Sequence, residues 1–446
     1  MSKMDENNLQ LKAFDFVEKI ISIENESNIQ NFESWKGSSS HLGVVDLTEK
    51  VIDSPIIITQ YMSDFSDYKI YVMINNMKYG FSEKEYKNFF KLVYEISEWN
   101  NIQSIVSIDY LKEKILTWIV NIYKSNVSNI DLFTFIENNL SKDVNKYRYC
   151  FPILNIDIEQ EFNVGDSKIK FFSKEFFDKL YETKKIKHKY SAENFDKIFR
   201  KYQGQVFVEI EVLAESKKAE LIAYENACYI VDILKLCSPT IQFPTEKCLL
   251  ELESRMPFSY DFLSFKNNNI YDFSITTKIN RSQMLPFDLK LVNDFKPFFY
   301  EFGKLLNPKY SSEIEKLVKN SIIFYSKCIS ETDIHLRVSK FIMIIESIFL
   351  LDDEKHKMEN KCKRRFTDFA YELRQKEKIN FNEILTDMYQ VRHKMTHKSI
   401  RVFIDNSKLR IFQIEIINLL FLLLKQNQNF NNKESLINYL DVKFNT

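Results

Sequence analysis

Two residues of this chain are best suited to chemistry: Arg392 and His397, five positions apart in the segment Arg392-His393-Lys394-Met395-Thr396-His397. An arginine is always charged and a histidine commonly titrates near neutral pH, so the pair suits phosphodiester chemistry. The arginine can hold a phosphate group and stabilise its developing charge, and the histidine can act as a general acid or base. The surrounding residues 391–410 are cationic, with six Lys and Arg residues against one acid, Asp405.

The spacing of Arg392 and His397 is a modest signal by itself. The chain holds 11 Arg and 6 His residues, so about 0.15 pairs with this spacing are expected by chance. On a straight helix, five residues at about 100° each would place the two side chains roughly 140° apart. They would share one site only if the helix ended between them, or if two copies of the chain lined one cleft across a two-fold axis. On spacing alone, an exposed and ion-paired helix end is an equally good interpretation.

The motif closes a helical pattern that begins near Phe381. No glycine follows Gly303 and no proline follows Pro308, so the last third of the chain lacks strong helix breakers. Apolar stripes at helical spacing in this region predict four or five amphipathic helices that pack as a bundle. We therefore predict an all-helical domain for residues 291–446.

Three features of this domain lead to specific expectations. Ser312 and Glu315 have the spacing of a capping box and predict the start of a helix. Glu346 lies inside an apolar stripe, where a carboxylate needs a partner, and Arg392 is the candidate partner. The most apolar run, Ile411 to Leu424, is interrupted by polar residues and is too short to span a bilayer, so we predict a core helix.

The rest of the chain alternates between strand and helix patterns. Residues 1–141 predict an N-terminal α+β region with helical spacing over 9–23, strands at 55–61 and 68–74, and helices from 82 to 140. Residues 142–290 predict a middle α+β domain with a hairpin turn at 163–166, a strand at 208–212 and a helix over 217–237 that Pro239 stops. The predicted fold class is α+β, with mixed N-terminal and middle regions followed by the helical bundle.

Composition narrows the functional classes. The formal net charge is zero, from 62 basic and 62 acidic residues, so nucleic-acid contact would depend on a local basic patch. The six glycines form no phosphate-binding loop, and the six cysteines form neither a CxxC pair nor a zinc-finger spacing. We therefore expect free thiols, no metal and no cofactor. The acidic, polar N-terminus is unlike a signal peptide, which favours a cytoplasmic protein without membrane contact.

The arginine, the polar residue after it and the histidine five positions on resemble the motif of HEPN ribonucleases. The motif also stands late in a predicted helical bundle, as it does in that family. Three segments resemble the ApeA-like HEPN proteins of bacterial anti-phage defence: 341–351, the basic run 361–365, and 388–392. The predicted hairpin, the helix that Pro239 ends and the Phe243-Pro244 pair resemble the middle region of those proteins. The resemblance covers roughly 142–446 and is weak before residue 140.

This resemblance implies a HEPN homodimer that cleaves RNA without a metal or cofactor. Arg392 and His397 would be catalytic, and the ribose 2′-OH of RNA would serve as a built-in nucleophile. Residues that would support the site or bind the RNA backbone are His393, Lys394, Lys398, Glu346, Arg364 and Arg365. A solvated helix face is an open alternative for 361–365. Lys398 stands where some relatives have glycine.

A growth-arresting nuclease must be silent in healthy cells. The family role therefore implies an abortive-infection ribonuclease that residues 1–290 restrain until a phage-derived trigger appears. Two alternatives are open: a non-catalytic HEPN scaffold or RNA-binding protein, against which the intact Arg392 and His397 argue, and the toxin half of a toxin–antitoxin pair. RNA cleavage that is lost in Arg392→Ala and His397→Ala would separate the nuclease from the scaffold.

Overall fold

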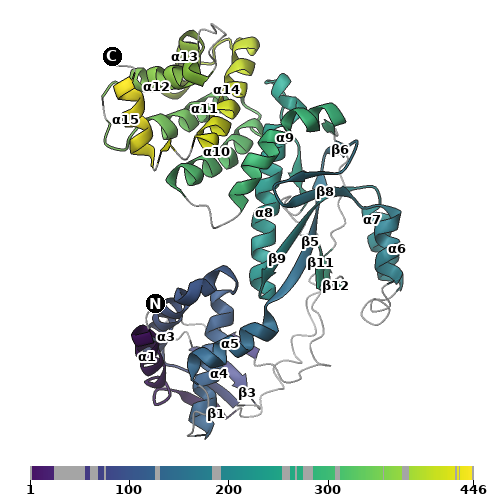
Figure 1. Ribbon diagram of the computed structural model, residues 1–446, viewed down its shortest axis with the longest axis vertical. Helices are drawn as coiled ribbons and strands as arrows, with labels where there is room; N and C mark the ends of the chain where they lie inside the picture. Colours follow the sequence, from purple (N-terminus) through teal and green to yellow (C-terminus); the bar gives the residue numbers. More distant parts are fainter. Residues whose placement is uncertain are drawn as a thin grey trace. The chain divides into compact units, whose positions relative to one another are not determined.

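A computed structural model describes most of the chain (Figure 1). The described residues are 3–24, 56–60, 69–74, 77–125, 131–182, 192–253, 262–266, 269–274, 285–306, 312–354, 356–373, 381–426, 429–430 and 432–443. The chain forms two compact units, residues 1–146 with 213–221 and residues 147–212 with 222–446. Most of the expected middle region therefore belongs to the same unit as the expected helical domain.

The first unit combines helices with a four-stranded antiparallel sheet of strand order β1-β4-β3-β2. The strands are β1 (Ile21–Glu24), β2 (Ile56–Gln60), β3 (Lys69–Ile74) and β4 (Met77–Gly80). The helices are α1 (Lys3–Phe14), α3 (Glu83–Ser97), the 3-10 helix η3 (Trp99–Ser104), α4 (Ile108–Ser125) and α5 (Leu132–Asp143). The helix expected over 9–23 ends already at Phe14, and Ile21 belongs to β1, where it pairs with Gly80.

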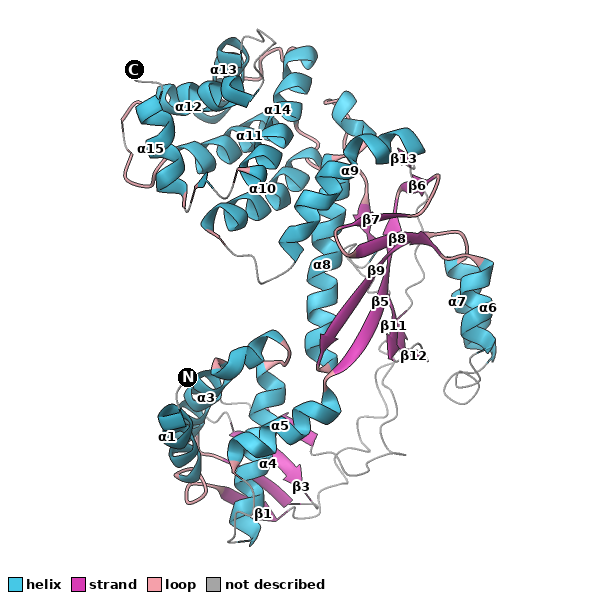
Figure 2. Cartoon of the chain, viewed as in Figure 1, coloured by secondary structure: helices cyan, strands magenta, loops and turns pink. Residues whose placement is uncertain are grey.

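The second unit contains a seven-stranded sheet of order β12-β11-β5-β9-β8-β7, with β10 paired to β5 (Figure 2). Its strands are β5 (Asn145–Leu154), β7 (Phe162–Val164), β8 (Ser167–Phe171), β9 (Val206–Ala214), β10 (Glu251–Leu252), β11 (Phe262–Lys266) and β12 (Asn269–Ser274). A separate parallel pair consists of β6 (Ile156–Ile158) and β13 (Leu285–Phe287). The helices of this part are α6 (Lys174–Glu182), α7 (Ala192–Tyr202), α8 (Ser216–Leu236) and η5 (Pro239–Gln242).

The remaining helices of this unit are α9 (Leu289–Gly303), η7 (Lys304–Leu306), α10 (Glu313–Ile329), α11 (Ile334–Phe349), α12 (Met358–Leu373), α13 (Phe381–Lys398), α14 (Asn406–Lys425) and α15 (Lys433–Lys443). Helix α11 packs against α10, α12, α13 and α14, so it is a central helix of the bundle. The expected α+β composition with a C-terminal helical bundle is confirmed. The capping box at Ser312 and the core helix over 411–424 are confirmed as well. Within the described ranges, no helix is long and apolar enough to cross a bilayer.

Arg337 connects α11 to the segment that follows α8. Its buried guanidinium donates to the backbone oxygens of Glu331 at 2.5 Å, Glu246 at 3.0 Å and Pro244. A buried guanidinium needs acceptors for its donors; both Nη nitrogens have them, whereas Nε has no partner among the described residues. The contacts of the two Nη nitrogens hold the helix against this segment. The central helix of the bundle is therefore tied to the sheet-bearing part of the same unit.

The hairpin between β7 and β8 meets α9 at a pair of glycines. Gly165 has a φ of 58°, and its N–H donates to the Phe299 oxygen at 3.2 Å. A Cβ atom added at Gly303 would lie 2.3 Å from the Gly165 nitrogen. This clash involves backbone, so no side-chain rotation can relieve it. The turn predicted at 163–166 is confirmed, and its close packing on α9 depends on glycine.

Replacing Gly303 with alanine is expected to lower the free energy of unfolding by about 1–3 kcal/mol, because α9 and the hairpin must separate. Urea denaturation of the full chain would measure the loss. Gly204→Ala is the control for an uncrowded glycine, since nothing lies within 4 Å of an added Cβ there; its φ of 80° strains an alanine in a way that Gly303 does not, and its loss should still be the smaller one. An equal loss in both variants would show that crowding at Gly303 is not the cause.

Candidate active site

Helix α13 carries the Arg392–His397 motif in its last two turns. Its buried residues recur every three or four positions: Phe381, Ile384, Leu385, Met388, Tyr389 and Val391. This stripe packs α13 against α11 and α12. The helix continues to Lys398, so it does not end between Arg392 and His397. Within one chain, the two side chains therefore do not share one face of the helix.

Arg392 is held by Glu346 of α11. The arginine Nη1 lies 2.5 Å from Glu346 Oε1, and the hydroxyl of Tyr389 donates to the same oxygen at 3.2 Å. The pairing expected between Glu346 and Arg392 is confirmed. The side chains of Arg392 and Glu346 are 32% and 19% exposed, so solvent partly screens the pair. Nε and Nη2 of Arg392 make no hydrogen bond to the described residues, which leaves donors available for an anion.

Tyr389 is a residue of this network that the sequence interpretation missed. Burial, followed by the nearby Cys362 thiol and the Glu346 carboxylate, raises the pKa of its phenol. Burial also raises the pKa of the Cys362 thiol to about 12. The phenol therefore stays protonated and keeps donating to Glu346. Its position three residues before Arg392, on the same side of the helix, was the available sequence signal.

His397 lies at the exposed end of α13. Its ring is next to that of His393, with the ring centroids 4.8 Å apart and the planes tilted by 51°. Both histidines are exposed. No hydrogen bond or ion pair within the described residues joins His397 to Arg392. The structure thus brings His393 to His397 and Glu346 to Arg392, but it does not join the two predicted catalytic residues.

The chain turns sharply after the motif. Ser399 has a φ of 53°, and its N–H donates to the Met395 oxygen at 3.1 Å. The Ile400 N–H donates to the Lys394 oxygen, also at 3.1 Å. Lys398 is the last helical residue, and the left-handed residue is Ser399. A side chain at position 398, where some relatives have glycine, therefore imposes no strain.

Part of the cationic charge in residues 391–410 is neutralised. Lys408 and Arg401 pair with nearby carboxylates. Lys394, Lys398 and Arg410 are exposed and form no ion pair with other described residues. Lys394 and Lys398 share the last two turns of α13 with His397, so unneutralised positive charge surrounds that histidine.

Arg365 is buried, which corrects the expectation that it binds RNA. Its side chain is 3% exposed, and all five of its N–H groups are used. Nε and Nη2 donate to Asp441 at 2.9 and 2.5 Å, Nη1 donates to the Phe349 oxygen and to Glu354, both at 2.7 Å, and Nη2 also donates to Glu354 at 2.9 Å. Arg365 therefore fastens α12 to α15 and to the segment after α11. Arg364, with a 42% exposed side chain, pairs with Asp441 at 2.5 Å, and its role in RNA binding stays a prediction.

Acid is expected to weaken the network around Arg365. Hydrogen bonds from Arg365 lower the pKa of Glu354 from 4.5 to about 2, against the opposing effect of burial. Because the folded-state pKa is the lower one, the stabilisation is complete above pH 4.5 and is lost as the pH falls toward 2. The difference corresponds to roughly 3 kcal/mol. Urea unfolding of wild type and Glu354→Gln should show a gap at about pH 7 that shrinks by about pH 3; a constant gap would contradict this.

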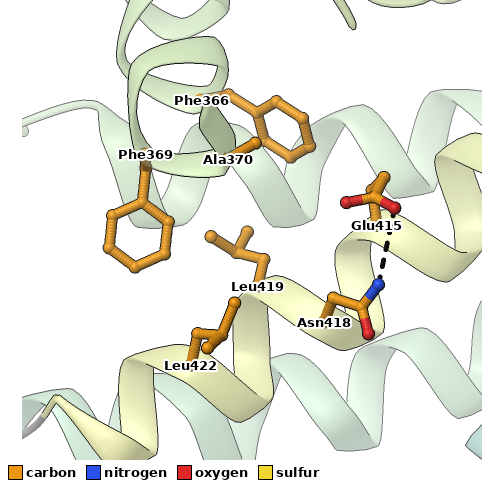
Figure 3. A pocket seen from close by; sticks show the side chains of 7 residues that line it. All are labelled: Phe366, Phe369, Ala370, Glu415, Asn418, Leu419 and Leu422. Atoms are coloured by element: carbon orange, nitrogen blue, oxygen red, sulfur yellow. Dashed lines mark hydrogen bonds between the residues drawn. The ribbon is translucent and has the colours of Figure 1, made fainter. Parts of the chain in front are cut away.

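Two hollows of the second unit do not include the candidate residues. One, of about 10 Å³, has space for roughly one water molecule. Its lining is shown in Figure 3: Phe366, Phe369, Ala370, Glu415, Asn418, Leu419 and Leu422. A larger groove of about 410 Å³ lies between the β7–β8 hairpin and α9, and its lining includes Phe162, Lys168 and Lys296. The candidate residues lie at the surface of the bundle, since the side chain of Arg392 is 32% exposed and His397 is exposed.

Comparison of the chain with models of known protein families, with curated proteins and with solved structures finds no match. In the part of the chain that the structure describes, no group of three or more His, Cys, Asp or Glu side chains is placed to hold a metal ion.

Proposed function

We propose that this chain is an endoribonuclease that cleaves RNA by a metal-independent mechanism of the HEPN type. His397 takes the proton of a ribose 2′-OH, and the 2′-oxygen attacks the adjacent phosphorus. The bond from phosphorus to the next 5′-oxygen breaks, and that oxygen takes up a proton. The products are a 2′,3′-cyclic phosphate and a 5′-hydroxyl. Arg392 stabilises the charge that develops on the phosphate.

The state of Arg392 is the observation that carries this proposal. Glu346 fixes one of its nitrogens at 2.5 Å, while Nε and Nη2 make no hydrogen bond to the described residues. A guanidinium held at one end and open at the other is oriented to receive a phosphate. Lys394 and Lys398 supply the local positive charge that a chain of zero net charge needs in order to attract RNA.

Within one chain, Arg392 and His397 do not lie in one site, and a homodimer formed by the bundle would bring such a pair together. Arg392 and His397 lie about 140° apart around α13. Two copies of α13 related by a two-fold axis would place Arg392 of one chain near His397 of the other. We therefore propose that the active form is a dimer and that the cleft between its copies receives the RNA.

The test is cleavage of labelled total RNA or tRNA by purified protein with EDTA present. It is run with and without lysate from phage-infected cells, because a restrained nuclease needs its trigger. Wild-type protein should cleave RNA and should leave 2′-O-methyl RNA intact, since the nucleophile is then blocked. Cleavage of both substrates, or loss of cleavage with EDTA, would overturn the mechanism.

Mixing Arg392→Ala with His397→Ala is expected to restore cleavage, although each variant alone is inactive. After random exchange of chains about half of the dimers are mixed, and each mixed dimer has one intact composite site. Activity should therefore reach about a quarter of the wild-type value. Native mass spectrometry would verify that mixed dimers form. Mixed dimers without recovered activity would contradict a site shared between chains.

The biological setting of this proposal is cytoplasmic anti-phage defence. A phage-derived trigger would release the nuclease, and residues 1–290 would sense it; this setting rests on the resemblance to ApeA-like proteins. One observation favours the alternative of a non-catalytic scaffold or RNA-binding protein, namely that Glu346 already neutralises Arg392. Binding of RNA without cleavage in the presence of the trigger would decide for that alternative.

A further inference from the structure

The connection between α13 and α14, residues 399–405, presents an aromatic ring to solvent. Phe403 is 92% exposed, although the residue after it, Ile404, is buried. A single exposed apolar residue is common on protein surfaces and needs no explanation by itself. Two further features of Phe403 point to a ligand: its backbone is anchored to α11, and basic residues lie near it in the sequence.

The backbone that carries Phe403 is fixed in place. Nε2 of the buried His335 lies 3.1 Å from the amide nitrogen of Val402 and 2.8 Å from its carbonyl oxygen, so the imidazole binds this backbone in either tautomer. Arg401 pairs with Asp333 at 2.7 Å at the start of α11. The ring therefore projects from an anchored loop, and little conformational entropy is lost when a ligand packs on it.

The residues around this ring are cationic. Lys394 and Lys398, which form no ion pair with other described residues, precede it on α13, and Arg401, which is paired with Asp333, precedes it by two positions. No acid occurs in the sequence between Val391 and Asp405. An aromatic face flanked by Lys and Arg is the pattern by which proteins bind single-stranded nucleic acid, because the bases stack on the ring and the cations follow the phosphates.

We propose that Phe403 is a stacking platform for an unpaired base of single-stranded RNA. The proposal rests on the proposed function and adds to it the class of substrate. Phe403 follows His397 by six residues, which span at most about 20 Å, and the turn at Ser399 shortens that distance. The stacked base thus lies within a few nucleotides of the phosphate to be cleaved. A phenyl ring offers a π face without donors or acceptors, so it selects an unpaired base without reading its identity.

The stacking role of Phe403 is tested with a fluorescein-labelled 2′-O-methyl oligonucleotide of about eight residues. This probe binds the site but is not cleaved. Anisotropy at low salt should show binding to wild type and about 5- to 100-fold weaker binding to Phe403→Leu. Phe403→Tyr should bind as wild type does, since it keeps the aromatic face. Tyr371→Leu is the matched control: Tyr371 is 70% exposed on α12 of the same bundle, and its loss should leave binding unchanged.

Three results would overturn the proposal. They are the absence of binding to wild type, equal binding by Phe403→Leu and wild type, and an equal loss in Phe403→Leu and Tyr371→Leu. A shift of Phe403→Leu from dimer to monomer in sedimentation would also overturn it, by assigning the ring to contact between copies of the chain. The nuclease activity is tested separately. Phe403-dependent binding without cleavage of natural RNA in the presence of the triggering lysate would overturn the proposed function and leave the stacking platform in place.

Discussion

Cleavage of RNA by His397→Ala is expected to be about 10²–10⁴-fold slower than cleavage by wild type. Without the imidazole, no positioned group in the proposed mechanism removes the proton from the 2′-OH. The side chain is exposed, and among the described residues its ring contacts that of His393, so the variant should fold normally. Initial rates on labelled RNA with EDTA and the triggering lysate would measure the loss, and thermal unfolding would show that the fold is intact.

His356→Ala is the matched control for this measurement. His356 is also an exposed histidine, and it lies between α11 and α12, outside the candidate site. Its variant should cleave at the wild-type rate. Equal rates for His397→Ala and wild type would remove His397 from the mechanism.

Arg365→Ala is expected to lower the free energy of unfolding by about 3–5 kcal/mol. The substitution removes the buried cation that joins Glu354 to Asp441, whose side chains are only 10% and 30% exposed. It leaves them the more exposed Lys361 and Arg364 as their ion-pair partners. It also leaves the Phe349 oxygen without the donor from Arg365. Because these partners belong to three different segments, α15 should detach from α12. Urea denaturation and amide hydrogen exchange in α15 would show the loss and its location.

Arg364→Ala is the control for this prediction, since Arg364 is adjacent in sequence and pairs with the same Asp441. Its side chain is 42% exposed, so its ion pair is screened by water and its loss should cost less than about 1 kcal/mol. If the two substitutions destabilised the protein equally, burial of Arg365 would not be the source of its effect. Weaker RNA binding in Arg364→Ala alone would support its predicted contact with the RNA backbone.

Much of the local structure could be predicted from the sequence alone. The capping box at Ser312, the turn at 163–166 and the stop of α8 before Pro239 depend on residues within a few positions of one another. Apolar periodicity likewise predicted α10, α11, α13 and α14, because the residues of a helix alone determine its buried stripe. The four or five helices expected in this region are fewer than the seven described there, α9 to α15. The pairing of Glu346 with Arg392 could be proposed because an acid within an apolar stripe requires a partner.

What the sequence could not determine depends on contacts between distant residues. Arg364 and Arg365 are neighbours in one basic run, yet a rotation of about 100° per residue directs one to solvent and the other inward. Arg365 is neutralised in part by Asp441, which lies 76 positions away in the sequence. The contact between His335 and the backbone of Val402, which holds the loop that carries Phe403, joins residues 67 positions apart. Local sequence patterns indicate the propensity of a segment to form a helix or a strand. Partners that lie far apart in the sequence meet only when the helices pack. Tertiary structure alone therefore determines which charges are neutralised and which face solvent.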